Sequence, residues 1–472
     1  MAAHDQLCFL DARRLAELLR ARELSAVEVV SAFLARIERL NPAVNAIPTL
    51  RPREELLAEA AAADARLARG EPVGPLHALP FAIKDLSLTR GLRTTFGSRI
   101  YRDFMPTSDE LYVERIKRAG GIVIGKTNTP EFGAGSQTFN ALFGATRNPY
   151  DLARTCGGSS GGAAAALACG MLPLADGTDL GGSLRNPASF CNVVGFRPSP
   201  GRVPRLNSHD DTLGVHGPMA RNVADLAMLL AVIAGPDPRD PLSLSEPGAA
   251  LAPPLGRDFR GTRIAWSERL GRYPVERAVT AVLDRARPAL EELGCDLVDA
   301  EPDLKGVDAI FQTLRAASYA ASLGGELERH RELLKDTVVW NIERGLALTP
   351  ADIARARAEK ATLERRVDAF FDRHEFLLLP VSQVAPFPVE VEWVREIEGV
   401  PMHTYVDWMA TCYAITCTGL PAISVPAGFT PGGLPIGLQI VGRRGHDRAV
   451  LELAYAFEQR TRCAERRPRL AI

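Results

Sequence analysis

Two glycine-rich segments near the middle of the chain present serines that could serve as nucleophiles. The first, "CGGSSGGAAAALACG", holds Ser159 and Ser160, and the second, "GTDLGGSLRNP", holds Ser183. Glycine lets a backbone approach a ligand closely, and a following helix N-terminus attracts negative charge, whether a phosphate or a developing oxyanion. A nucleophilic serine also needs a base, and the nearest histidine in the sequence, His209, is far from Ser183 along the chain.

Lysine is rare in this sequence, and one lysine stands in an apolar segment. The chain has six lysines beside fifty arginines; Lys84 lies in "LHALPFAIKDLSL", a strand-like run, whereas Lys117 lies in a charged helical segment. A buried lysine is costly unless it is neutral or paired. Lowering its pKa from ~10.4 by roughly three units would make its amine a base for a serine. A strand-end lysine paired with Asp85 is the structural alternative.

Other nucleophile chemistries match parts of the sequence. Both Ser159 and Ser160 satisfy G-x-S-x-G, the nucleophile elbow of α/β-hydrolases. Such an esterase would take its base from a downstream histidine: His374, His403 or His446. A glycine-rich segment meets this short pattern easily, so the pattern alone does not decide. A P-loop and a penicillin-type S-x-x-K site are excluded, because no lysine stands at the required spacing.

A third alternative is a metal site in "NSHDDTLGVHGP". Its imidazole and carboxylate groups could ligate a metal ion, and they belong to His209, Asp210, Asp211 and His216. A turn with solvated polar side chains is the simpler interpretation. We therefore expect neither a metal nor another cofactor.

The elements that must position these residues follow from periodicity. Residues 8–70 predict helices, one ending at Asn41–Pro42 and an alanine-rich one at Gly70. Residues 79–240 alternate strand, helix and strand, as in "PFAIKDL" and "IVIGKTN". Residues 250–400 are mostly helical, with a short strand in "FLLLPVS". A β-hairpin follows, from "PAISVPAGF" through "TPGGLP" to "IGLQIVG". We expect one α/β body with a helical insertion.

Composition describes an ordinary globular enzyme-sized chain. With 472 residues, 46% hydrophobic residues and a net charge of −1, it gives no electrostatic reason to bind nucleic acid or an anionic membrane. The N-terminus has no signal-peptide pattern, and no apolar run is long enough to span a membrane. The eight cysteines are scattered, and Cys412 and Cys417 lack metal-site or redox spacing. We expect a cytoplasmic protein with reduced thiols.

The quoted segments resemble the amidase signature family of serine hydrolases. "GGSSGGAAAALACGMLPLADGTDLGGSLRNPASFCNVVGFRPSPGRV" follows the diagnostic segment of the family, and "GPLHALPFAIKDL", "TNTPEFGAGSQTFNALFGATRNPYD" and "TGLPAISVPAGFTPGGLPIGLQIVG" agree with its flanks. The resemblance spans roughly residues 10–450, and residues 250–400 are its least diagnostic part. It implies cleavage of C–N bonds in amides.

The resemblance also implies site residues. Ser183 matches the nucleophile, Ser159 the bridging serine after a cis peptide bond from Gly158, and Lys84 the base that begins neutral. The oxyanion hole would be formed by the backbone N–H groups of Leu180, Gly181, Gly182 and Ser183. The resemblance further implies that Ser160, Asp179 and Arg185 hold the catalytic loops in place. It also implies that Gly133 and Gly135 lie in the loop that passes over the substrate.

The implied architecture is an α/β/α layered single domain over residues 1–472. Helices at 1–70 precede a catalytic core at 71–245 and 400–450, and a mostly helical substrate-specificity insertion covers 250–400. The implied substrates are a small amide, carbamate (urethane) or ester, together with water. We expect no nucleic-acid or membrane partner, and the resemblance leaves room for a homodimer.

Departures from the family pattern bear on specificity. Arg197 replaces the usual lysine, and Ser199–Pro200 alter the next turn. The segment "PRLNSHDDTLGVHGP" is also unlike that of tRNA-dependent amidotransferase A subunits, which remain an alternative that would need partner subunits. Specificity is expected from residues 250–400 and from loops near Tyr405, Asp407 and Trp408. A binding protein with an inactive site is a further alternative, against which Lys84, Ser159 and Ser183 are all present.

Overall fold

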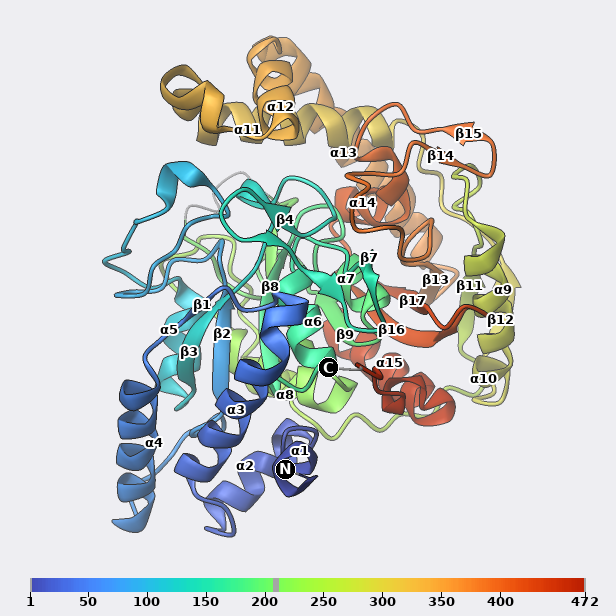
Figure 1. The fold of residues 1–472 in the computed structure, drawn as a ribbon. Helices are drawn as coiled ribbons and strands as arrows, with labels where there is room; N and C mark the ends of the chain where they lie inside the picture. The colour runs from blue at the N-terminus through green and yellow to red at the C-terminus, as the bar shows by residue number, and fades with distance from the viewer. Residues whose placement is uncertain (1, 207–211, 471–472) are drawn as a thin grey trace.

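An eight-stranded mixed sheet forms the centre of the protein (Figure 1). The structure, a computed structural model, describes residues 2–206 and 212–470. The strand order is β12-β11-β13-β17-β16-β9-β10-β8; β12 and β13 run parallel to β11, and the other neighbours are antiparallel. The strands are β8 Leu174–Asp179, β9 Val194–Arg197, β10 Val215–Ala220, β11 Arg263–Trp266, β12 Asp296–Asp299, β13 Phe376–Pro380, β16 Ala422–Phe429 and β17 Pro435–Gly442.

A smaller sheet beside β8 carries Lys84. Its order is β1-β3-β2, with β1 Thr49–Leu50, β2 Pro80–Lys84 and β3 Ile122–Thr127. β2 and β3 are parallel, and the connection between them contains α5 Leu111–Arg118, so the predicted strand–helix–strand unit is confirmed. The backbone N–H of Lys84 donates to both carboxylate oxygens of Asp176 on β8, each at 3.2 Å. This contact ties the two sheets together at the position where the lysine leaves its strand.

Helices cover the sheets and close over one end of the molecule (Figure 1). The N-terminal helices are α1 Ala2–Leu7, α2 Ala12–Arg20, α3 Ala26–Val44 and α4 Arg53–Ala68. Packed on the central sheet are α6 Gly161–Ala168, α7 Arg185–Phe190, α8 Val223–Ile233, α9 Arg277–Ala286, α10 Pro288–Glu291 and α15 Asp447–Thr461. The group at the top of Figure 1 consists of α11 Val307–His330, α12 Asp336–Leu346 and α13 Pro350–Phe371. α14 Ala410–Thr418 packs against α11 and α13.

Three short strand pairs lie outside the two larger sheets. They are β4 Phe139–Asn140 with β5 Gly144–Ala145, β6 Arg147–Asn148 with β7 Asp151–Thr155, and β14 Glu396–Ile397 with β15 Val400–Pro401. The predicted C-terminal hairpin is confirmed as the antiparallel pair β16 and β17.

The expectation for residues 250–400 is confirmed, and one helix boundary was wrong. Helices dominate this range, and the strand predicted in "FLLLPVS" is β13. β11 and β12 also arise from this range and join β13 in the central sheet; they have four residues each, too few for an alternating pattern to show. The helix predicted to end at Asn41–Pro42 continues to Val44, and Asn45 ends it in the left-handed conformation with φ 56°.

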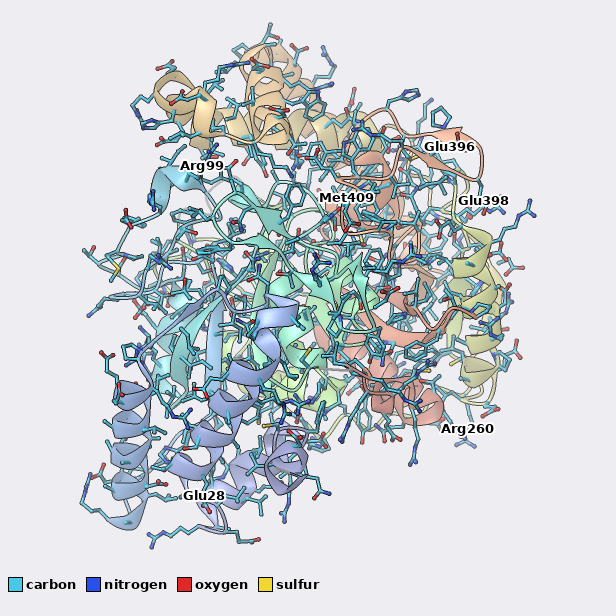
Figure 2. The ribbon with its side chains drawn as sticks, in the orientation of Figure 1. Glu28, Arg99, Arg260, Glu396, Glu398 and Met409 are labelled. Atoms are coloured by element: carbon cyan, nitrogen blue, oxygen red, sulfur yellow. The ribbon has the colours of Figure 1, made fainter. Side chains whose placement is uncertain are left out.

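Charge is distributed as expected for a globular chain. Charged side chains such as those of Glu28, Arg260 and Glu398 project from the periphery (Figure 2). In the described part of the chain, no helix is both long and apolar enough to cross a membrane. The few fully buried charged groups therefore stand out, and several of them gather around Lys84.

Candidate active site

Lys84 ends β2 with a fully buried amine surrounded by hydroxyl groups. Its Nζ lies 2.7 Å from Ser159 Oγ, 2.8 Å from Ser160 Oγ and 2.9 Å from Thr178 Oγ1. A neutral amine has two N–H donors and one lone pair, so it can serve three hydroxyls by donating to two and accepting from one. The arrangement therefore suits a lysine that accepts a proton from a serine.

Burial decides the protonation of Lys84. It lowers the pKa of the amine from 10.5 to about 7, against the opposite effect of Asp176 and Asp179. The alternative pairing with Asp85 is not observed, because that carboxylate accepts hydrogen bonds from Thr95. With a pKa of about 7, about half of the amines are neutral at pH 7.

The first glycine-rich segment turns tightly before α6 and delivers two serines to Lys84. The Gly158–Ser159 peptide bond is cis, in agreement with the resemblance described above. The carbonyl of Gly158 accepts a hydrogen bond from Ser136 Oγ at 2.6 Å. The Ser160 N–H donates to the carbonyl of Ser183 at 3.1 Å, which joins this segment to the second glycine-rich one.

The loop that carries Ser183 is organised around the carboxylate of Asp179, at the end of β8. Its two oxygens accept from the N–H groups of Gly182 at 2.9 Å and Leu184 at 3.1 Å. The Gly182 N–H is thus already engaged and is not free to bind an oxyanion, unlike the prediction. The remaining predicted donors are the N–H groups of Leu180, Gly181 and Ser183.

Two buried arginines hold Asp179 in place. Arg185 donates to it through Nε at 3.0 Å and Nη2 at 2.9 Å, and Arg197 donates to its carbonyl at 2.7 Å. These charges and hydrogen bonds hold the pKa of Asp179 well below its usual value although the group is fully buried. The substitution noted at Arg197 therefore lies against the nucleophile loop, where its guanidinium supports the backbone.

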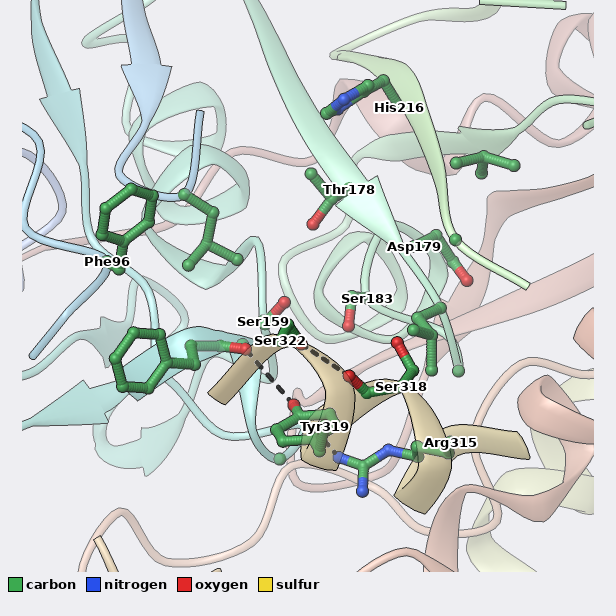
Figure 3. A pocket seen from close by; sticks show the side chains of 18 of the residues that line it. Phe96, Ser159, Thr178, Asp179, Ser183, His216, Arg315, Ser318, Tyr319 and Ser322 are labelled. Carbon is green, nitrogen blue, oxygen red and sulfur yellow. Dashed lines mark hydrogen bonds between the residues drawn. The ribbon is translucent and has the colours of Figure 1, made fainter. Parts of the chain in front are cut away.

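Ser159 and Ser183 line one cavity of about 410 Å³ (Figure 3). This volume falls in the usual range for small-molecule sites. Gly133 and Gly135 line it too, and a Cβ added to Gly133 would lie 3.5 Å from Ser159 Oγ. Phenylalanine and tyrosine side chains contribute to the wall, and they belong to Phe96, Phe132, Phe311 and Tyr319.

Comparison with known proteins identifies the family. The family model described as Amidase matches residues 28–451. An acylamidase of Rhodococcus erythropolis is 36% identical over 467 residues, which cover 98% of each chain. This chain belongs to the amidase signature family. The glutamyl-tRNA(Gln) amidotransferase A subunit of Moorella thermoacetica is also 36% identical, over 99% of this chain and 100% of its own.

A solved structure agrees with this membership. The structure of a bacterial aryl acylamidase of the amidase signature family superposes with a TM-score of 0.90 at 30% identity, covering 98% of this chain and 99% of that chain. The protein is therefore an amidase, a hydrolase that acts on C–N bonds of small amides.

Several residues singled out in the sequence lie away from the cavity of this amidase. His374 stacks on Phe370, and none of His374, His403 and His446 lines the cavity, so none of these three histidines can supply the base of the esterase alternative. Tyr405 and Trp408 are buried, and Asp407 accepts from the N–H groups of His403 and Thr404. Tyr405, Asp407 and Trp408 do not line the cavity, whereas the adjacent Met409 does.

The proposed metal ligands fall mostly outside the described residues. This applies to His209, Asp210 and Asp211, while His216 is described and lines the cavity. Burial holds the pKa of His216 well below its ordinary value, and its ring lies 4.7 Å from that of Tyr112. Within residues 2–206 and 212–470, no three potential ligands cluster as a metal site would require.

Sequence reasoning missed part of the site of this amidase. Thr178 was overlooked although it stands in the quoted "GTDLGGS" segment, where its hydroxyl could have been considered beside the two serines. Lys126, in "IVIGKTN", is as buried as Lys84 and has the same sequence signature. No sequence pattern indicated the cavity residues on α11, because this helix lies in the range least similar to the family. These residues are Phe311, Arg315, Ser318, Tyr319, Ser322 and Leu323.

Proposed function

We propose that this amidase hydrolyses small amides, aryl amides foremost, by transferring the acyl group to Ser183. The observation that carries the proposal is the buried amine of Lys84, which lies 2.7 Å from Ser159 Oγ. Ser159 in turn lines the cavity together with Ser183. In the described part of the chain, no other buried lysine or histidine has a side-chain nitrogen within hydrogen-bond distance of Ser159 Oγ.

The first chemical step transfers two protons in relay. Neutral Lys84 accepts the proton of Ser159 as Ser159 accepts that of Ser183, and Ser183 Oγ bonds to the amide carbon. The carbonyl oxygen then carries the negative charge. Backbone N–H groups of Leu180, Gly181 and Ser183 are the donors proposed to stabilise it, an effect typically worth about 100- to 1,000-fold per donor in kcat.

The second step breaks the C–N bond. The relay returns a proton to the nitrogen, which leaves as a neutral amine, and Ser183 keeps the acyl group as an ester. Water repeats the sequence on this acyl-enzyme: its proton passes to the relay, its oxygen bonds to the acyl carbon, and Ser183 recovers its proton. Carboxylic acid and amine are the products, and no external oxidant or cofactor enters the balance.

The cavity wall supports aryl amides as substrates. Aromatic rings of a substrate pack favourably against aromatic side chains, and four such side chains line this cavity: Phe96, Phe132, Phe311 and Tyr319. The superposed aryl acylamidase supports the same class. Aryl carbamates and esters remain within the proposal, because the same relay can attack their carbonyl carbons.

The test is release of 4-nitroaniline from a set of 4-nitroanilides, with an aryl carbamate and an aryl ester alongside. Ser183→Ala should lower kcat/KM by about 1,000-fold or more, because it removes the nucleophile. Ser245→Ala, at an exposed serine, is the matched control and should retain the wild-type rate. EDTA should leave the rate unchanged. Equal rates in Ser183→Ala and wild type, or loss of activity with EDTA, would refute the mechanism.

An amidotransferase A-type subunit is the second candidate. The similarity to the Moorella thermoacetica protein, at 36% identity over nearly the whole of both chains, favours it. Such a protein would need partner subunits for its transfer reaction. Turnover of 4-nitroanilides by the chain purified alone, with Ser183 required, supports the stand-alone hydrolase; silence on every amide and ester, with activity restored by amidotransferase partner subunits, supports the other.

A further inference from the structure

Arg315 is a buried cation in the wall of the cavity. It lies on the face of α11 that also presents Ser318, Tyr319 and Ser322 to the cavity (Figure 3). Its side chain is only 4% exposed. The guanidinium is therefore largely removed from bulk water, and what it touches determines whether its charge is compensated.

The contacts of Arg315 are all with neutral groups. Nη1 donates to the side-chain oxygen of Asn341, and Nη2 lies 3.4 Å from the hydroxyl of Tyr319. The guanidinium carbon lies 4.6 Å from the ring centre of Tyr319 and 5.2 Å from that of Tyr405. These contacts fix the orientation of the guanidinium, and the aromatic rings offset part of its burial cost, but none of them supplies an opposite charge.

The other buried arginines of the described chain are compensated by carboxylates. Arg185 and Arg197 both contact Asp179, and Arg202 pairs with Asp447 at 3.0 Å. Within the described residues, no carboxylate pairs with Arg315. Since removing one partner from a buried ion pair is strongly unfavourable, a buried arginine without a carboxylate is expected to meet one from outside the chain.

We propose that Arg315 binds a carboxylate of the substrate, so that this amidase prefers amides bearing an anionic group. This inference rests on the proposed function and specifies the substrate class of the same cavity. An arginine has five N–H donors. Two go to Asn341 and Tyr319, and the Tyr405 hydroxyl can take a third. At least two remain, as many as a carboxylate accepts side by side.

The charges around the cavity are consistent with an anionic ligand. Among the described residues that line it, Asp179 is the one carboxylate, and Arg185 and Arg197 already neutralise it. Lys84 is at least half neutral at and above pH 7 with a pKa of about 7. Nothing described in the wall therefore opposes a substrate carboxylate, while Arg315 attracts it.

Matched substrates test this preference. Glutaryl 4-nitroanilide carries a carboxylate on the acyl side, and 5-methylhexanoyl 4-nitroanilide replaces it with an isopropyl group of similar shape. The pair 4-acetamidobenzoate and 4-isopropylacetanilide tests the amine side in the same way. We expect at least one pair to favour the acid in wild type, and Arg315→Gln to reduce its ratio of kcat/KM by about tenfold or more. Because each ratio is taken on one preparation, partial misfolding of a variant cancels.

Two further variants sharpen the result. Arg315→Lys keeps the charge but loses the planar pair of donors, so its ratio should fall between those of wild type and Arg315→Gln. Arg205→Gln, at the other arginine of the cavity wall, should retain more of the preference than Arg315→Gln. If Arg315→Gln leaves both ratios unchanged, or if Arg205→Gln abolishes the preference instead, the assignment to Arg315 is wrong.

Failure of the inference and failure of the proposed function give different results. Ser183-dependent hydrolysis of the neutral anilides without any preference for acids refutes the inference alone. If wild type hydrolyses none of the four compounds, the inference is tested by titration calorimetry of ligand binding. Ser183→Ala is used because it lacks the nucleophile and cannot turn the ligands over. Benzoate should bind at least about tenfold more tightly than benzamide, and Arg315→Gln added to Ser183→Ala should remove this difference; equal binding of both ligands would refute it.

Discussion

Lys84 and Lys126 are both fully buried lysines on neighbouring parallel strands, but their surroundings favour different protonation states. Lys126 donates to the carbonyl of Ser87 at 2.6 Å and is attracted by Asp85. Burial lowers the pKa of Lys126 to about 8 and that of Lys84 to about 7, so at neutral pH a larger share of Lys84 is neutral. The amine of Lys84 also lies within hydrogen-bond distance of Ser159 Oγ. Of the two, Lys84 is therefore the better base.

The activity of the amidase should increase with pH through the titration of Lys84. Because the proposed base must be neutral, protonation below its pKa of about 7 removes it. We expect kcat/KM for a 4-nitroanilide to increase about tenfold per pH unit below pH 6 and to level off above pH 8. The measurement is a profile from pH 5 to 9 with a substrate that does not itself titrate.

An aryl ester provides the control for this profile. Its leaving group needs no proton, so the same acid limb in ester and anilide places the titration on activation of Ser183 rather than on departure of the amine. A rate that is independent of pH, or that falls between pH 6 and 8, would contradict the role of Lys84.

Sequence patterns indicated the serines and Lys84 but could not separate other residues of the same type. Glycine-rich turns mark Ser159 and Ser183, and few lysines compete with Lys84. Lys126 has an equally apolar strand, and only the register shows the difference: Ile83 pairs with Lys126 and Lys84 with Thr127, so the two lysines point to opposite faces. Arg315 is one of fifty arginines, and no local pattern reveals that it is buried.

At the scale of elements, the turn between β8 and α7 depends on two glycines with different constraints. Gly182 has a φ of 114°, and a Cβ there would lie 2.6 Å from Cys412 Cβ and 2.7 Å from Asn186 Nδ2. Gly181 has no such φ, and its nearest obstacle is the ring of Phe311 at 3.0 Å. At Gly182 the φ angle of the backbone disfavours any side chain. At Gly181 the obstacle is the ring of Phe311, which can move.

Alanine substitutions at these two glycines should therefore differ. Gly182→Ala combines an unfavourable φ with two close contacts and should lower the free energy of unfolding by about 2 kcal/mol or more. Gly181→Ala should cost less than about 1 kcal/mol, while its methyl group narrows the cavity at Phe311. Urea unfolding of the two variants measures the difference, and equal losses would show that the turn is not constrained as described.

Elements with strong patterns were predictable and short ones were not. The hairpin of β16 and β17 has eight-residue strands around "TPGGLP", and the parallel pair β2 and β3 brackets an amphipathic helix. By contrast, β11 and β12 have four residues each and derive their strand character from neighbours in the sheet rather than from their own sequence. The pairing that extends the sheet at this edge is a long-range property that periodicity does not report.

At the scale of the molecule, the site exists only where three parts meet. Lys84 comes from the small sheet, Ser183 follows β8 of the central sheet, and Arg315 comes from α11, whose side chains line the cavity (Figure 3). The strand of Lys84 and the turn of Ser183 could be recognised in the sequence, but the distance between them depends on packing between the sheets and on the Asp176 contact with Lys84. The same packing buries the lysine, so the proposed catalysis and the cost in stability share one cause.

This shared cause predicts how stability changes with pH. The pKa of Lys84 is about 7 in the folded protein, against an ordinary lysine value of 10.5 that the unfolded chain should show, so between these values the unfolded chain binds more protons. The stability that this group contributes is therefore complete above pH 10.5 and decreases progressively as the pH falls from 10.5 to 7, where it is lost. In the other direction, the free energy of unfolding increases from pH 7 to pH 9. Lys84→Met, of similar length but without a charge, lacks this dependence.

The free energy of unfolding of wild type minus that of Lys84→Met should thus increase by about 2 kcal/mol from pH 7 to pH 9. Urea unfolding of both proteins at each pH gives this double difference, in which the titration of all other groups cancels. The hydroxyls left unpaired in the variant change its free energy of unfolding equally at both pH values, so they do not affect the double difference. A difference that stays constant would mean that Lys84 keeps its proton in the folded state, and the same lysine could then not begin the reaction as a base.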